Sequence, residues 1–76
     1  MSVGRVAVLG ESVRVQGYAL AGAVTLVAED PDEVRSAWRT LATDVVLVVL
    51  TPRAAAALGD AVLERTREPL VVAMTT

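Results

Sequence analysis

The chain has 76 residues, of which 54% are hydrophobic, and it contains neither Cys nor His. Its seven cationic side chains are all arginines, and its formal net charge is −2. These features exclude disulfides, thiolate and imidazole chemistry and the lysine of a P-loop, and they argue against nucleic acid as a partner.

The length and the short apolar runs bound the organisation of the chain. We expect one globular α/β domain over residues 1–76, because chains divide into several domains only at greater length. The run Val45–Leu50 is far shorter than the ~20 residues that a membrane helix needs. Arg5 and Glu11 interrupt any apolar run near the N-terminus, so no signal peptide is expected there. We therefore expect a cytoplasmic protein with no direct membrane insertion.

The first third of the chain predicts strand, helix and strand. Val6–Leu9 is a short apolar run that ends at Gly10, which is typical of a strand. Residues 11–21 carry apolar side chains at helical spacing, and Gly22 stands where a C-terminal cap belongs. A second strand is predicted over Ala23–Ala28. The inward positions of this first helix are expected to be Val13, Gly17, Leu20 and Ala21.

The middle of the chain begins with a strong helix start. Asp30 can cap free backbone N–H groups, and Pro31 fits the first helical position. The helix ends before Asp44. Val45–Leu50 is then apolar at every position, which is typical of a strand covered by helices on both faces. The inward stripe of the helix is Val34, Ala37, Trp38 and Leu41.

The last third repeats the pattern. Thr51 and Pro52 form a second cap and proline start, and a helical segment over Arg53–Arg67 follows. Gly59 inside it has two readings, close packing against the sheet or a break into two short helices. Leu70–Met74 is the predicted last strand. The inward positions of the helical segment are expected to be Ala55, Leu58, Ala61 and Val62.

This alternation predicts the fold class. Four strands separated by three helices require a parallel sheet with right-handed crossovers. The two most apolar strands belong in its centre, so the expected strand order is 2-1-3-4. The topology is Rossmann-like or flavodoxin-like.

In such sheets, ligands bind beyond the carboxyl ends of the strands, where the strand order reverses. That position corresponds here to Gly10–Val13 and Thr51–Arg53. Gly10 stands alone, without the GxGxxG pattern of dinucleotide sites. A phosphoryl-accepting receiver domain would need an acidic pair, an acceptor Asp and a Lys that this chain lacks. Glu11 is better explained as a partner of the helix dipole.

Carboxylate acid/base chemistry is a third possibility at this edge. Asp30 and Asp32 are explained as helix-start residues, and Glu29 as a solvated loop charge. Nothing in the sequence pairs these groups across a pocket. We expect no catalytic residue, no cofactor and no metal site.

Two segments carry a family resemblance. Val6–Glu11, read with Gly17–Gly22, resembles the N-terminal globular part of the F subunit of archaeal/vacuolar-type rotary ATPases. Tyr18 stands where that family usually has Phe, and Glu11 where Asp is common. The acidic turn at residues 29–33 and the run from Pro69 to Val72 also look like the family, so the likeness extends to about residue 74.

The resemblance implies a non-catalytic component of the central stalk. Such a component docks on the coiled-coil D subunit, beside neighbouring stalk subunits, and turns with the shaft as ATP hydrolysis or synthesis is coupled to ion transport. It is peripheral to the membrane as part of the complex. Family members usually continue into a C-terminal helix after the fourth strand, and we expect no such helix here because the sequence stops at Thr76.

The candidate interface residues lie on the first strand-end loop and on the first predicted helix. Tyr18 leads them, because it falls off the inward stripe and has the amphipathic ring that interfaces favour. Trp38 is expected to be core. The alternative function is a free-standing sensor of a small molecule or nucleotide. It would use the groove at the switch point, the place at Gly10–Val13 and Thr51–Arg53 where the strand order reverses. The candidate interface residues of the stalk function are Glu11, Ser12, Gly17, Tyr18 and Gly22.

Overall fold

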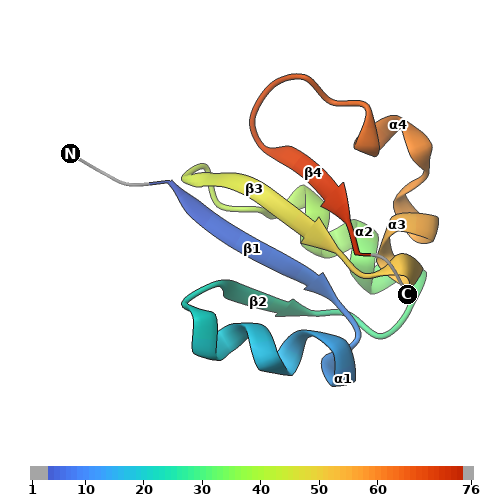
Figure 1. The fold of residues 1–76 in the computed structure, drawn as a ribbon. Coiled ribbons are helices and arrows are strands. Elements are labelled where there is room, and N and C mark those ends of the chain that lie inside the picture. Colours follow the sequence, from blue (N-terminus) through green and yellow to red (C-terminus); the bar gives the residue numbers. More distant parts are fainter. Residues whose placement is uncertain (1–3, 75–76) are drawn as a thin grey trace.

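The computed structural model describes residues 4–74, with side chains given for all of these except residues 19–21 (Figure 1). Four strands form one parallel sheet in the order β2-β1-β3-β4, which confirms the predicted fold class. The elements in chain order are β1 (Arg5–Gly10), α1 (Ser12–Val15), the 3-10 helix η1 (Gln16–Ala21), β2 (Val24–Val27), α2 (Pro31–Arg39), β3 (Val45–Leu50), α3 (Pro52–Leu58), α4 (Asp60–Leu63) and β4 (Leu70–Ala73).

Both predicted cap-plus-proline starts are confirmed. The Asp30 side chain accepts a hydrogen bond from the Glu33 N–H at 2.8 Å, and α2 begins at the following proline. The Thr51 hydroxyl accepts one from the Ala54 N–H at 3.2 Å at the start of α3. Each bond satisfies one of the N–H groups that a helix start leaves without an internal partner.

The first helical segment differs from its prediction in which residue faces the core. The α-helix spans only four residues and then tightens into η1, which turns every three residues. Val13 is 80% exposed, whereas Val15 is 1% exposed, so the prediction that Val13 packs inward is wrong. Gly22 closes the segment at φ 87°, as a left-handed C-terminal residue should. The predicted inward roles of Leu20 and Ala21 fall on side chains outside the described ones.

Gly59 breaks the third helical segment. Its φ is 90°, and its N–H closes the last turn of α3 on the Ala55 carbonyl at 2.9 Å. The reading that divides this segment into two short helices is therefore the one the structure shows. The prediction of helix as far as Arg67 is wrong, since α4 ends at Leu63. The break also turns Ala61 outward, and it is exposed.

The main core lies on one face of the sheet, beneath α2 and α3. Figure 1 shows α2 behind the sheet and α3 near the carboxyl ends of β3 and β4, while α1 and η1 run along its β2 side. Ala7, Leu9, Val48 and Leu50 point into this core from the two central strands, and Trp38 packs at its margin, half-buried. The core cluster is Ala7, Leu9, Ala28, Val34, Val45, Val48, Leu50, Ala54 and Val71.

The opposite face of the sheet is only partly covered. Strand side chains alternate between faces, and the register aligns Val6 with Leu47 and Leu70, and Val8 with Val49 and Val72. α1 and η1 contact β1 and β2, and none of the described elements lies over this face of β3 and β4. The prediction that β3 is covered on both faces is thus wrong for this face. We call the surface formed by Val6, Leu47, Val49, Leu70 and Val72 the open face.

Candidate functional site

At the carboxyl end of the sheet, the loops after β1 and β3 press directly on each other. A Cβ placed on Gly10 would lie 2.1 Å from Cγ2 of Thr51 and 2.4 Å from its hydroxyl oxygen. Because such distances are far inside van der Waals contact, only glycine fits at residue 10. The backbone also ties the two strand ends together, since the Thr51 N–H donates to the Leu9 carbonyl at 3.1 Å.

Thr51 and Glu11 form a buried polar pair across this junction. Thr51 has 0% exposure and Glu11 has 9%. The Thr51 hydroxyl is the main cause that lowers the pKa of the Glu11 carboxyl, followed by a backbone hydrogen bond and, with smaller effects, the positive charges of Arg53 and Arg14. Glu11 also stands at the N-cap position of α1 with extended backbone. The Glu11 carboxylate therefore lies within the junction of the loops after β1 and β3, and little of its surface is accessible to a partner.

The remaining carboxylates at this end are engaged in local structure. The Glu29 N–H donates to the Glu33 carboxylate at 2.7 Å. The Glu29 carboxylate in turn accepts from the Ser12 N–H at 3.4 Å, at the start of α1. The prediction that Glu29 is a solvated loop charge is incomplete, because its side chain caps another helix. Glu11, Glu29 and Asp30 nevertheless line one hollow together, so the expectation that no carboxylates meet at a pocket is wrong.

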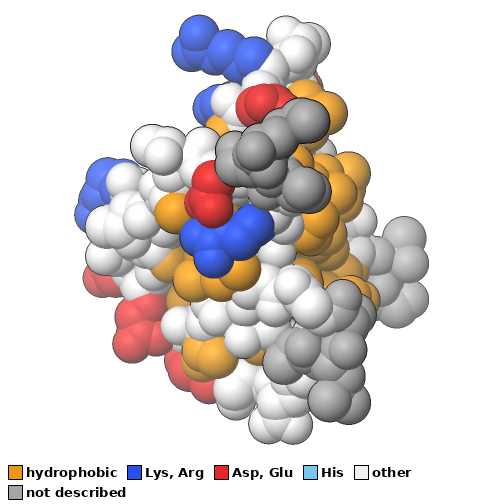
Figure 2. Space-filling view, turned by 90° about the vertical axis from the view of Figure 1, so that its left-hand side faces the viewer, with side chains coloured by type: hydrophobic (Ala, Val, Ile, Leu, Met, Phe, Trp, Pro, Cys, Tyr) orange, Lys and Arg blue, Asp and Glu red, His pale blue; other side chains and the backbone are white. Residues whose placement is uncertain are grey.

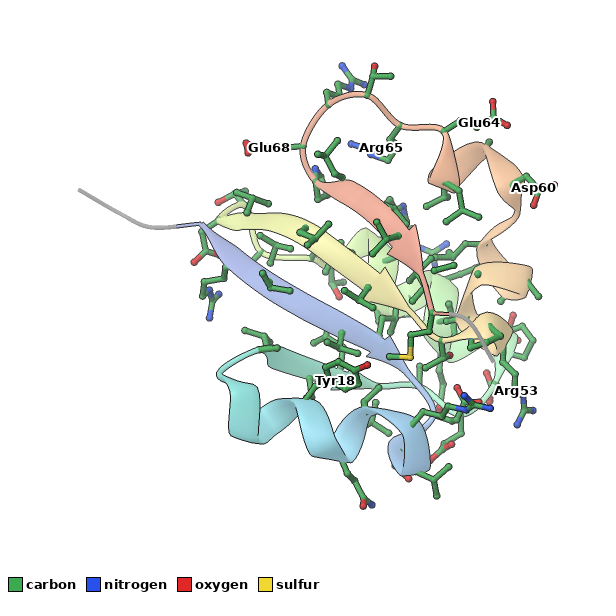
Figure 3. All side chains as sticks on the ribbon, in the orientation of Figure 1. Tyr18, Arg53, Asp60, Glu64, Arg65 and Glu68 are labelled. Atoms are coloured by element: carbon green, nitrogen blue, oxygen red, sulfur yellow. The ribbon has the colours of Figure 1, made fainter. Side chains whose placement is uncertain are left out.

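The hollow between these loops is small. It has a volume of about 50 Å³ and lies among Glu11, Glu29, Asp30, Arg53 and the adjacent apolar side chains. Figure 3 shows Arg53 beyond the tips of the strands. Sites for small organic ligands usually measure about 300–1,000 Å³, so this hollow is too small for a nucleotide. Within residues 4–74 the structure also contains no group of three or more Asp or Glu side chains placed to hold a metal ion.

The five predicted interface residues fall in three separate places. Glu11 is buried at the loop junction, and the neighbouring Ser12 is half-buried. Gly17 is exposed with open space around it. Tyr18 and Gly22 instead line a groove beside the open face. The structure therefore brings Tyr18 and Gly22 together and separates them from Glu11.

This groove runs between η1 and the central strands. It has a volume of about 470 Å³, and its walls include Val6, Val8, Tyr18 and Val49. Figure 3 shows the Tyr18 side chain rising from η1 toward the sheet. Tyr18 keeps 38% of its surface exposed. The prediction that Tyr18 lies off the inward-facing stripe is therefore only partly correct. The ring contacts the groove beside the sheet, and its outer part remains exposed.

Sequence reasoning missed the open face itself. Val6, Leu70 and Val72 are 37%, 44% and 48% exposed, although each lies in a strand with an apolar sequence. One sequence feature could have indicated the open face, namely the shortness of the segment between β3 and β4. This segment forms only α3 and α4, which cover one face of the sheet and leave the other face of these strands bare. Figure 2 shows hydrophobic side chains gathered on its right-hand side, where the front of Figure 1 is seen edge-on.

A second cleft of about 470 Å³ lies at the opposite end of the sheet. The Arg65 guanidinium sits 5.6 Å from the centre of the Trp38 ring there. It also donates to the carbonyls of Pro69 at 3.0 Å and Glu68 at 3.2 Å. Arg65 thus fastens the segment before β4 onto α2, which is a structural role.

These features define a small flavodoxin-like α/β fold whose switch point is closed by its own side chains. Within residues 4–74, no helix has the length and apolarity needed to cross a membrane. A family model described as ATP synthase (F/14-kDa) subunit matches residues 6–76, and the chain therefore belongs to this family, the F subunits of the V/A-type ATPases. Comparison with individual curated proteins gives no match, and neither does comparison with solved structures.

Proposed function

We propose that this protein is a non-catalytic component of the central stalk of a V/A-type ATPase, and that it docks on the coiled-coil D subunit. The observation that carries the proposal is the family match over residues 6–76. The closed switch point agrees with it. Glu11 and Thr51 are buried at the position where related folds bind ligands, so the surfaces of the fold are left to provide function.

In this role the protein turns with the shaft and links ATP hydrolysis or synthesis to ion transport without reacting with ATP itself. It works on the cytoplasmic side, peripheral to the membrane, beside the other stalk subunits. The tightly joined loops after β1 and β3 suit an element that transmits torque, because close-packed interiors deform little under load. The one globular unit expected over residues 1–76 is the part that docks.

Tyr18 is the candidate interface residue best placed for this docking. It is the single tyrosine of the chain, it is 38% exposed, and it borders the groove beside the open face. Truncation of an aromatic side chain at the centre of an interface commonly costs more than ~1 kcal/mol of binding free energy. We therefore expect Tyr18→Ala to weaken binding to the D subunit roughly fivefold or more.

The test is co-purification of the chain with the D subunit of the same complex, followed by calorimetry on the isolated pair. A one-to-one complex that Tyr18→Ala weakens, with an unchanged circular dichroism spectrum, supports the proposal. Val13→Ala is the matched control, since Val13 is 80% exposed and lies outside the groove. Absence of any complex at tens of micromolar protein would refute docking by this part of the chain.

A further inference from the structure

Residues 60–69 form an arch that is packed less tightly than the sheet. The arch consists of α4 and the loop that leads to β4, and we call it the flap. Val62 packs in part against the core cluster, whereas the other three side chains of α4 are exposed. Figure 3 shows Asp60, Glu64 and Glu68 along the outer side of the flap. A segment with so few buried apolar contacts opens at a lower free energy than the strands beside it.

The flap begins at a hinge. Gly59 is the residue that ends α3 and precedes α4, with φ 90° and ψ 165°, a conformation that is open to glycine and strained for other residues. Among the described residues, no side chain caps the first turn of α4, which spans four residues. A helix of about one turn has little stability of its own. The backbone at Gly59 can therefore rotate without breaking α3, whose last turn is already closed.

Arg65 fastens the flap at its middle. Its guanidinium lies 5.6 Å from the centre of the Trp38 ring on α2, and Figure 3 shows Arg65 inside the arch. The same group donates to the carbonyls of Glu68 and Pro69, which belong to the flap itself. Within residues 4–74 no carboxylate forms an ion pair with Arg65. The contact between Arg65 and Trp38, which we call the latch, is thus what ties this group across to α2.

The latch stands beside a cleft. The cleft of about 470 Å³ lies where the flap meets the end of α2, and its walls include Trp38, Val45, Arg65 and Pro69. We propose that the flap is a conformational device that opens about Gly59 when Arg65 leaves Trp38, while the sheet stays folded. Opening exposes the Trp38 ring and widens the cleft. The device is independent of the stalk function, because every contact in it lies within the chain.

The first test is hydrogen exchange of the wild-type chain, followed by NMR for each amide. The N–H groups of Val62, Glu64 and Arg65 are hydrogen-bonded within this segment, so they exchange when the flap opens. The N–H of Val48, in the central strand β3, exchanges when the sheet unfolds. We expect the flap amides to exchange at least about a hundredfold faster than that of Val48. Equal protection of the flap and of β3 would overturn the proposal, because the two would then open together.

The second test removes the latch. Arg65→Gln lacks the charge that contacts the ring, and Arg67→Gln is the matched control, since Arg67 is exposed on the same flap. A contact between a cation and an aromatic ring changes an equilibrium roughly two- to thirtyfold. We expect Arg65→Gln to raise exchange of the flap amides about fivefold and to leave that of Val48 unchanged. Arg67→Gln should change neither by more than about twofold.

Fluorescence gives an independent readout, because Trp38 is the single tryptophan of the chain. Acrylamide should quench it more strongly in Arg65→Gln than in wild type or Arg67→Gln. Arg65→Lys keeps a cation for the ring without the fork that binds two carbonyls, so its exchange and quenching should lie closer to wild type. A lysine variant as open as the glutamine variant would overturn the latch on Trp38. A rise in exchange that is equal at Val48 and in the flap would show that Arg65 stabilises the whole fold, which also overturns it.

Discussion

Replacement of Thr51 by valine tests whether the junction of the two loops holds the fold together. Valine keeps the shape of the side chain and removes the hydroxyl. The Ala54 N–H then loses its cap, which costs about 1 kcal/mol. The Glu11 carboxylate loses its donor in a nearly buried position, which adds at least about 1 kcal/mol. We expect a total loss of about 2 kcal/mol in the free energy of unfolding, against ~4–11 kcal/mol for a chain of this size.

The measurement is urea denaturation followed by circular dichroism near neutral pH, with thermal melting as a second readout. A loss of about 2 kcal/mol lowers the melting temperature of so small a protein by roughly 8–16 °C. Thr51→Ser is the control, because it keeps the hydroxyl that caps Ala54 and faces Glu11 and loses only a methyl group. Titration of Glu11 by NMR should show a lowered pKa in Thr51→Ser and a return toward the ordinary value in Thr51→Val. A Thr51→Val protein within about 0.5 kcal/mol of wild type, the range of an ordinary surface substitution, would refute the reasoning.

The remaining predictions concern Glu11 and the glycines. Since the pKa of Glu11 is lowered on folding, its charge stabilises the fold above the ordinary carboxyl pKa, and this contribution disappears as pH falls through the lowered value. Glu11→Gln should therefore be less stable than wild type near neutral pH, with the gap in urea midpoints closing below about pH 4; a gap constant with pH would contradict this. Gly59→Ala should lose about 1–2 kcal/mol in the same denaturation assay because its φ is 90°, whereas Gly17→Ala, in open space, should be neutral or gain up to ~1 kcal/mol. Gly10→Ala should lose about 1–3 kcal/mol through overlap with Thr51, and equal stability of the Gly10 and Gly17 variants would show that the two loops do not press together.

Features fixed by neighbouring residues could be predicted from the sequence. The starts of α2 and α3 depend on a side chain and an N–H three residues apart, and both hydrogen bonds are present. The β3 run appears with its predicted bounds, Val45–Leu50, because an uninterrupted run of Val and Leu favours no other element of that length. The strand order followed from which strands are the most apolar.

Features fixed by distant contacts could not be predicted. Val13 and Val15 are equally apolar, and only the early change from α-helix to η1 turns Val15 inward. The environment of Glu11 depends on Thr51, which lies forty residues further along the chain. The half-covered face of β3 could not be predicted from periodicity, which reports that a side chain is apolar and not which element covers it; only the shortness of the segment between β3 and β4 pointed to it. For the same reason the sequence points to Tyr18 as an exposed side chain and not to Val72.

The position of the main core, on one face of the sheet, has a consequence for how folding and assembly relate in this protein. The cluster that includes Leu9, Val48 and Leu50 is complete without any contribution from the open face. A residue such as Val72 can therefore be changed with little effect on the folded state, while a change at Leu50 affects folding first. A change on the open face is therefore expected to leave the protein folded, and any effect it has on binding would pass unnoticed in an assay that measures folding alone.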